Sequence, residues 1–120
     1  MQLINMEEKL KQARFALMTM FEVLETDIIE MKSRKKNKVY ARMIYNYYLL
    51  KIIKIPHVKI KHHIKGMHHA TSIYHKNKFE FDMKQYDSVS MEWKTFLFFA
   101  DYQEWKQIDS IKEMKIKYIN

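Results

Sequence analysis

A chain of 120 residues with a formal net charge of +8 and no cysteine fits one modest domain. It excludes both a disulfide framework and a thiolate metal site. A single glycine and a single proline argue against a turn-rich β fold and favour long helices. The longest uncharged apolar stretch, residues 43–50, is far too short to span a bilayer, and no signal peptide is expected. We therefore expect a cytoplasmic all-α protein of about five to six helices, with no membrane contact.

The excess positive charge is concentrated in one central block. Residues 31–79 carry thirteen basic residues, all six histidines and no acid, whereas residues 1–30 and 80–120 carry net charges of −3 and −2. A uniformly basic surface would not be divided in this way. The pattern is typical of a polyanion-binding module held between two structural helical segments. A lysine-rich composition without functional meaning is the alternative.

Residues 5–31 are predicted to form one long amphipathic helix. Asn5 can cap its first turn, with Glu8 three residues later as in a capping box. The spacing is interrupted at Asp27, which argues against a coiled coil, and packing within the same domain is favoured over a dimer seam. The apolar positions follow a 3-4 spacing: Leu10, Ala13, Leu17, Met20, Leu24 and Met31, with Phe21 and Ile28 beside them.

Residues 32–38 form a basic bridge in which five of seven side chains are cationic. We interpret this bridge as a loop whose cations are available to phosphates, and a solvated charge run is the alternative. A strongly apolar helix follows over residues 39–53, with Arg42 and Lys51 off its main apolar face. Pro56 ends this helix. Its apolar positions indicate a central, buried helix: Ala41, Ile44, Tyr47, Tyr48 and Ile52.

Gly66 separates two short helical patterns, residues 58–65 and residues 68–81. A lone glycine at such a junction suits a left-handed backbone conformation, and it predicts the turn of a helix-turn-helix. In the second helix, Ile73 and Phe79 are expected to point inward. The side chains expected to point outward are His69, Thr71 and Tyr74.

The last segment, residues 82–120, is predicted to pack an aromatic helix on the first helix. Asp87 or Ser88 would cap this helix, and a final helical turn would begin near Asp109, with Ile111, Met114 and Ile116. We expect a single domain over residues 1–120 with three parts, 1–31, 33–81 and 82–120. The predicted C-terminal helix contains Met91, Phe96, Leu97, Phe99, Ala100 and Trp105.

Residues 66–75 read G-M-H-H-A-T-S-I-Y-H. This stretch resembles the signature G-R-D-H-T-T-V-L-H-A of the C-terminal DNA-binding domain of the bacterial replication initiator DnaA. Gly66, His69 and Thr71 match the signature outright, and Ile73 replaces its leucine. The family's basic start, its alanine-arginine pair and its apolar helix align upstream without a gap, on Ser33-Arg34-Lys35, Ala41-Arg42, Ile44, Tyr47 and Ile60.

The resemblance implies roles for particular residues. Arg34 would enter the minor groove and Arg42 would contact DNA, while His69 and Thr71 would contact bases in the major groove. Tyr74 takes the place of the signature's second histidine. Several positions depart from the family, and they are Met43, Met67, His68 and Ala70.

These departures fall at or beside base-reading positions. His68 stands where the signature has an aspartate, so an acceptor suited to cytosine is missing there. Ala70 can contact a thymine methyl group, but its side chain cannot form a hydrogen bond. We therefore expect the DNA-binding mode to persist and the preferred sequence to differ. The family's ATPase module is absent from the chain, because a Gly-rich phosphate loop needs more than one glycine.

The leading hypothesis is a protein that binds double-stranded DNA, with a sequence preference, in replication control or transcription regulation. It needs no cofactor, no metal and no enzymatic chemistry. The histidines lack the spacing of a zinc site, and they would instead make binding sensitive to pH. The predicted DNA-binding residues are Arg34, Lys35, Lys36, Lys38, Arg42, Lys59, Lys61, Lys65, His68, His69, Ala70, Thr71 and Tyr74.

Two questions stay open at the level of sequence. A homodimer or a replication-protein partner is compatible with the pattern. A protein-interaction module, which would keep the fold and bind or inhibit replication factors without specific DNA readout, is the alternative function. The Lys-, Ile-, Asn- and Tyr-rich composition suggests an AT-rich genome, such as that of a phage acting in the host cytoplasm.

Overall fold

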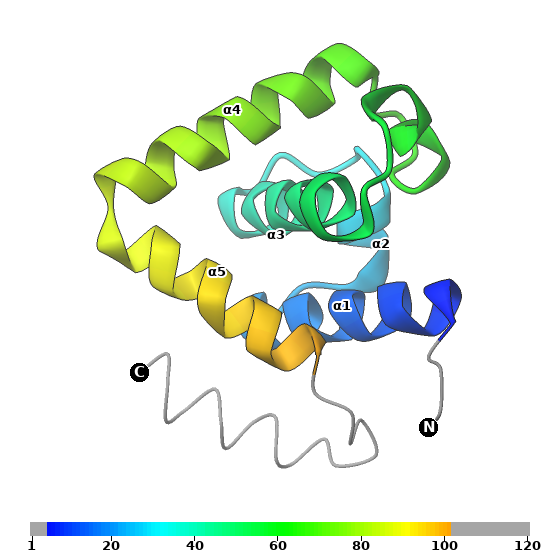
Figure 1. Cartoon of the computed structure of the whole chain (residues 1–120). Helices are drawn as coiled ribbons and strands as arrows, with labels where there is room; N and C mark the ends of the chain where they lie inside the picture. The colour runs from blue at the N-terminus through cyan, green and yellow to red at the C-terminus, as the bar shows by residue number, and fades with distance from the viewer. Residues whose placement is uncertain (1–4, 102–120) are drawn as a thin grey trace.

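The computed structural model describes residues 5–101, which are helical through most of their length and contain no β-strand beyond one isolated bridge. The expected all-α class is confirmed. Figure 1 shows α3 in the middle, with α4 on one side and α1 on the other. The elements are α1 (Met6–Phe21), α2 (Glu25–Ile29), α3 (Lys36–Tyr48), the π-helical η1 (Leu49–Ile53), the 3-10 helix η2 (His57–His62), α4 (His69–Gln85) and α5 (Asp87–Ala100).

The first helix is shorter than the periodicity predicts. Asn5 caps α1 as expected, because its side chain accepts a hydrogen bond of 2.8 Å from the Glu8 amide. The helix then ends at Phe21, and Glu22 adopts a left-handed conformation with φ 55°. Asp27, at which the apolar spacing breaks, accepts a hydrogen bond of 2.9 Å from the Leu24 amide and so starts α2. The prediction of a single helix over residues 5–31 is therefore wrong. Leu24, which was expected on the apolar face of that helix, is exposed.

The central helix is buried as predicted. Every residue from 41 to 48 lies in the interior, and this run forms the middle of the core. The helix begins at Lys36, whereas the prediction placed its start at Val39. The first turn is polar and solvated, so it shows no apolar periodicity from which its helical structure could be predicted. After Tyr48 the helix continues as the π-helical η1, which ends at Lys54 in a left-handed conformation with φ 68°. Ile52, expected in the core, is 38% exposed.

Aromatic side chains join α3, α4 and α5. The ring of Tyr47 lies 5.1 Å from that of Phe79 and 5.0 Å from that of Trp93, and Trp93 lies 5.6 Å from Phe96. Such pairs add to the free energy of burial. The α5 helix packs along α1, which confirms the predicted pairing of the first helix with an aromatic C-terminal helix.

The start of α5 differs in detail from the prediction. The N-cap position is Tyr86, whose side chain makes no capping hydrogen bond, and Asp87 lies in the first turn. An acid there interacts favourably with the helix dipole. Trp105 and the turn predicted from Asp109 lie outside the described residues. Within residues 5–101, no helix is long and apolar enough to cross a membrane.

Candidate nucleic-acid interface

The segment around Gly66 has the predicted order of short helix, turn and long helix. The first of these helices is the 3-10 helix η2, not an α-helix over residues 58–65. Gly66 adopts φ 88°, as expected for the only glycine. The turn is tied to the chain after α2, since the Met31 amide donates to the Lys65 carbonyl (2.9 Å) and the Lys65 amide to the Ile29 carbonyl (2.7 Å).

Replacing Gly66 with alanine is expected to lower the free energy of unfolding by roughly 1 to 2 kcal/mol, because a side chain is disfavoured at this φ. The new Cβ would also lie 3.3 Å from the Cβ of Met31, a contact that requires a shift of the neighbour. Urea unfolding followed by circular dichroism measures the loss. Gly66→Asn is the matched control, with a smaller loss expected because asparagine tolerates the left-handed region better. Equal stability of the alanine variant and the parent would contradict the conformation assigned to this turn.

The long helix α4 buries one face and exposes the opposite one. Ser72, His75 and Phe79 are buried. His69 and Tyr74 point outward as expected, with Tyr74 62% exposed, whereas Thr71 is only half-exposed. His69 and Thr71 are two positions apart and so lie about 200° apart around the helix. They therefore border the exposed face from opposite sides, with Ala70 between them.

Two expectations for α4 need correction. Ile73 was predicted to point inward and is 40% exposed. The helix also continues to Gln85, four residues beyond the predicted end. Since α4 packs against α3, η2 and α5, it does not need a strong apolar periodicity of its own.

A buried polar network, which sequence reasoning missed, fixes α4 against α3. The Asn46 amide donates to the Ser72 carbonyl (3.1 Å), and the Ser72 hydroxyl donates to Asn46 Oδ1 (2.7 Å). The same hydroxyl lies 3.1 Å from His57 Nδ1 at the start of η2. Each buried polar group of this network thereby gains a partner. In the sequence, the only indication of this network is that Asn46 and Ser72 are polar residues at positions that face the core.

Most of the basic residues that were predicted to contact DNA lie at the surface. Arg34, Lys35 and Lys36 are exposed in the loop before α3 and at its first residue, and Lys59, Lys61 and Lys65 are exposed around η2 and the turn. Lys38 is less available, because its Nζ lies 3.2 Å from Asp27 Oδ1. The hydrogen bond from the Leu24 amide, together with Lys38, lowers the pKa of Asp27 and keeps this carboxylate charged.

Arg42 is not a surface residue, so the DNA contact expected for it is wrong in this structure. It is 2% exposed. Its Nε donates to the Asp27 carbonyl (3.1 Å) and its Nη2 to the Ser33 carbonyl (3.2 Å). The guanidinium therefore joins α2, the basic loop and α3 from inside the protein.

Arg34 and Lys36 border an open groove of about 600 Å³, which is lined by α3, the C-terminal half of α4, the first half of α5 and the end of α1. The carboxylates in this groove already have partners: Asp82 pairs with Lys78 (3.3 Å), and Glu92 accepts from the Tyr40 hydroxyl (2.9 Å). The charge of Asp82 is thus compensated by a lysine, whereas Glu92 keeps its negative charge in this groove.

The six histidines do not form a metal cluster. In the part of the chain that the structure describes, no three histidine, aspartate or glutamate side chains are placed to hold a metal ion. His75, at the position of the signature's final alanine, is buried in α4, and burial followed by the nearby charge of Arg42 lowers its pKa.

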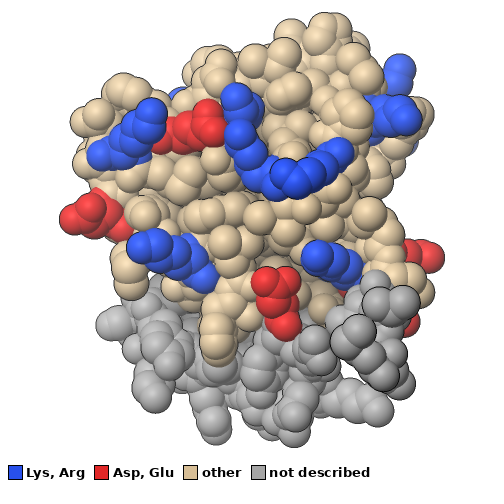
Figure 2. Space-filling model, viewed as in Figure 1, with Lys and Arg blue, Asp and Glu red and all other residues tan. Residues whose placement is uncertain are grey.

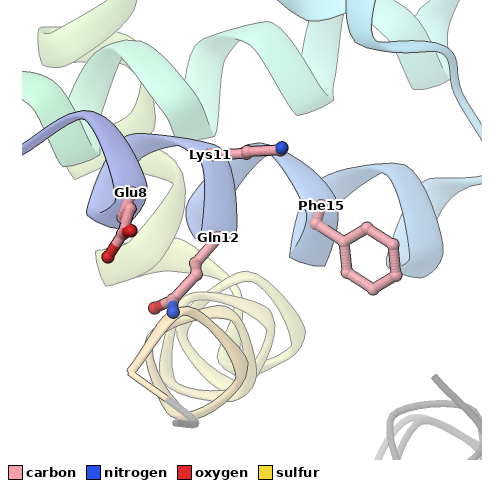
Figure 3. A pocket seen from close by; sticks show the side chains of 4 residues that line it. All are labelled: Glu8, Lys11, Gln12 and Phe15. Carbon is pink, nitrogen blue, oxygen red and sulfur yellow. The ribbon is translucent and has the colours of Figure 1, made fainter. Parts of the chain in front are cut away.

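Another groove, of about 300 Å³, lies on α1 and is lined by Glu8, Lys11, Gln12 and Phe15. Figure 3 shows Glu8, Gln12 and Phe15 projecting to one side of the helix. Since α1 and α4 lie on opposite sides of α3 (Figure 1), this groove is not part of the surface around Gly66.

The fold and the surface around Gly66 define an all-α protein that presents one face of a long helix beside basic loops. Comparison with protein-family models, with curated proteins and with solved structures gives no match.

Proposed function

We propose that the chain binds double-stranded DNA through η2, the Gly66 turn and α4, in the manner implied by its resemblance to the DNA-binding domain of DnaA. The observation that carries the proposal is the exposed start of α4: His68, His69 and Ala70 are all at the surface, while the other side of the helix is held by the core. In a helix-turn-helix protein, the N-terminal residues of the second helix contact base edges in the major groove.

The charge around this helix supports the same function. Arg34, Lys35 and Lys36 project from one connection, and Lys59, Lys61 and Lys65 from another. Exposed cations of this kind supply the sequence-independent part of DNA affinity by neutralising phosphates. Arg42 and Lys38 are left out of the proposed contact set, because one is buried and the other is paired with Asp27.

The side chains at the start of α4 would set the sequence preference. His68 and His69 can donate hydrogen bonds to base acceptors, and Ala70 offers a methyl group to thymine. Thr71 and Tyr74 border the same exposed surface. The proposed task is replication control or transcription regulation.

Fluorescence anisotropy with labelled duplexes tests the proposal. The duplex should be selected first from a random pool, and affinity should fall steeply as salt rises. Arg34→Ala should weaken binding to every duplex and reduce the salt slope by about 0.9. His69→Ala should weaken binding mainly to the selected duplex, by roughly 10-fold.

Lys94→Ala is the matched control, because Lys94 is an exposed lysine on α5, away from the proposed surface. It should bind like the parent. Absence of duplex binding at low salt, or unchanged affinity of both the Arg34 and the His69 variants, would overturn the proposal.

A second candidate function is a protein-interaction module that binds or inhibits replication factors. It is favoured by apolar exposure on the outer face of α4, where Ile73, Tyr74 and Phe81 are 40%, 62% and 59% exposed. Exposed apolar patches often mark interaction sites. Phe81→Ala discriminates the two functions, because it should leave duplex affinity unchanged and weaken binding to a protein partner.

A further inference from the structure

A second basic surface lies where η1 meets η2. An open groove of about 360 Å³ is bordered there by three lysines and one histidine, which are Lys51, Lys54, Lys76 and His57. Its remaining walls are Leu50, Ile55 and Pro56. In Figure 2, basic side chains run across the upper half of the molecule over α3 and α4, with an acidic side chain beside them.

The backbone brings these cations together. Lys54 adopts φ 68°, a conformation that is unusual for a residue with a side chain. The Ile55 amide then donates to the Leu49 carbonyl (2.8 Å), and the chain reverses into Pro56. The left-handed Lys54 ends η1, so that the lysines of η1 and its cap lie at one groove with His57 of η2 and Lys76 of α4.

The hydrogen bonds of His57 define its tautomer. The single proton of the Ser72 hydroxyl is donated to Asn46 Oδ1 (2.7 Å), so this oxygen can only accept from His57 Nδ1 (3.1 Å). Neutral His57 therefore carries its proton on Nδ1. The atom that gains a proton on titration is Nε2, and its protonation adds a positive charge to the groove without disturbing the buried network.

The groove keeps a positive balance in spite of one nearby acid. Glu80 lies 3.4 Å from Lys51 Nζ and 3.6 Å from Lys76 Nζ, and it accepts a hydrogen bond from the Tyr47 hydroxyl (3.0 Å). Burial acts to raise the pKa of Glu80, but Tyr47 and the lysines outweigh it and lower the pKa. One carboxylate thus pairs with two of the three lysines, and Lys54 makes no ion pair within residues 5–101.

The protonation of His57 responds to this surplus of positive charge. Burial lowers its pKa first, and the charges of Lys76, His69 and Lys51 lower it further. A bound anion would reverse the electrostatic part of this shift, since an opposite charge within about 4–6 Å favours the protonated form.

We propose that Lys51, Lys54, His57 and Lys76 form a binding site for a phosphate group. Lysine supplies point charges and flexible donors for phosphate oxygens, and protonated His57 adds a further donor. The phosphate belongs either to a free ligand or to a DNA backbone. The site itself does not depend on duplex binding, but a backbone phosphate there would rest on the function proposed above.

The position of the groove fits a backbone phosphate beside an inserted helix. Lys76 borders this groove, whereas Lys78 borders the groove of Arg34. Two positions correspond to about 200° around a helix, so the two basic grooves lie on opposite flanks of α4. A major groove likewise has a phosphate backbone on each side.

Histidine NMR of the full chain tests the site. The pKa of His57 is measured from its Cε1–H signal without ligand and then with inorganic phosphate, a mononucleotide or a duplex, each against sodium chloride of equal ionic strength. Phosphate occupancy should raise the pKa of His57 by about one unit relative to chloride. Lys54→Gln and Lys76→Gln should each reduce this ligand-induced rise, whereas Lys94→Gln should leave it intact.

The arms separate the two sources of phosphate. A rise with inorganic phosphate or the mononucleotide identifies a free-ligand site, and a rise with the duplex alone identifies a backbone site. An unchanged pKa of His57 in all three arms would overturn the site, even where anisotropy shows that the duplex binds. Conversely, a rise with inorganic phosphate in a chain that does not bind duplex supports the site and removes the function proposed above.

Discussion

Replacing Arg42 with alanine is expected to lower the free energy of unfolding by about 3 kcal/mol. The substitution removes two hydrogen bonds from a buried guanidinium and leaves the carbonyls of Asp27 and Ser33 without these donors. Burial lowers the pKa of Arg42 and the charge of Asp27 opposes this effect, but an arginine stays protonated. The connection between α2, the basic loop and α3 would be lost.

Urea unfolding followed by circular dichroism measures this effect, with Arg34→Ala as the matched control. Arg34 has the same side chain in the preceding loop but is exposed, so its replacement should change stability by less than about 0.5 kcal/mol. Parent-like stability of Arg42→Ala would contradict the buried position of this arginine. Any loss of duplex binding in Arg42 variants has to be corrected for the unfolded fraction.

Replacing Phe79 with alanine is expected to cost about 4 kcal/mol, because it opens a cavity in the centre of the aromatic core. Phe79 is fully buried, and its ring lies 5.1 Å from that of Tyr47 and 5.8 Å from that of Trp93. Thermal and urea unfolding both report this loss. The loss exceeds that of a surface change because the neighbouring rings collapse only partially into the space.

Phe81→Ala provides the control on the same helix. Phe81 lies two residues further along α4 and is 59% exposed, so its truncation should change stability by less than about 0.5 kcal/mol. A large loss at Phe81 together with a small loss at Phe79 would show that α4 is rotated relative to the face assigned here.

Features of the chain with a strong local cause could be predicted from the sequence. The near absence of glycine and proline predicts a helical protein, and the apolar run before Pro56 predicts the buried central helix. The positive φ of Gly66 could also be predicted, because the only glycine of the chain lies between two helical patterns, where a left-handed conformation is common.

Features set by tertiary contacts could not be predicted in this way. The break after Phe21 depends on a left-handed Glu22 and on Asp27, and residues on both sides of the break are apolar at compatible positions. Arg42 looks like a surface cation in sequence, since the carbonyl groups that hold it come from two other segments. Pattern alone gives no signal for such partners.

The two main-chain hydrogen bonds between Met31 and Lys65, and between Lys65 and Ile29, have a consequence for recognition. They connect the chain just before the basic bridge, residues 32–38, to the turn at Gly66, although these segments are more than thirty positions apart in the sequence. Their relative placement is settled during folding, so an encounter with a polyanion would have to order side chains rather than main chain. In the proposed DNA complex, this fixed arrangement would lose less conformational entropy on binding than a flexible loop would.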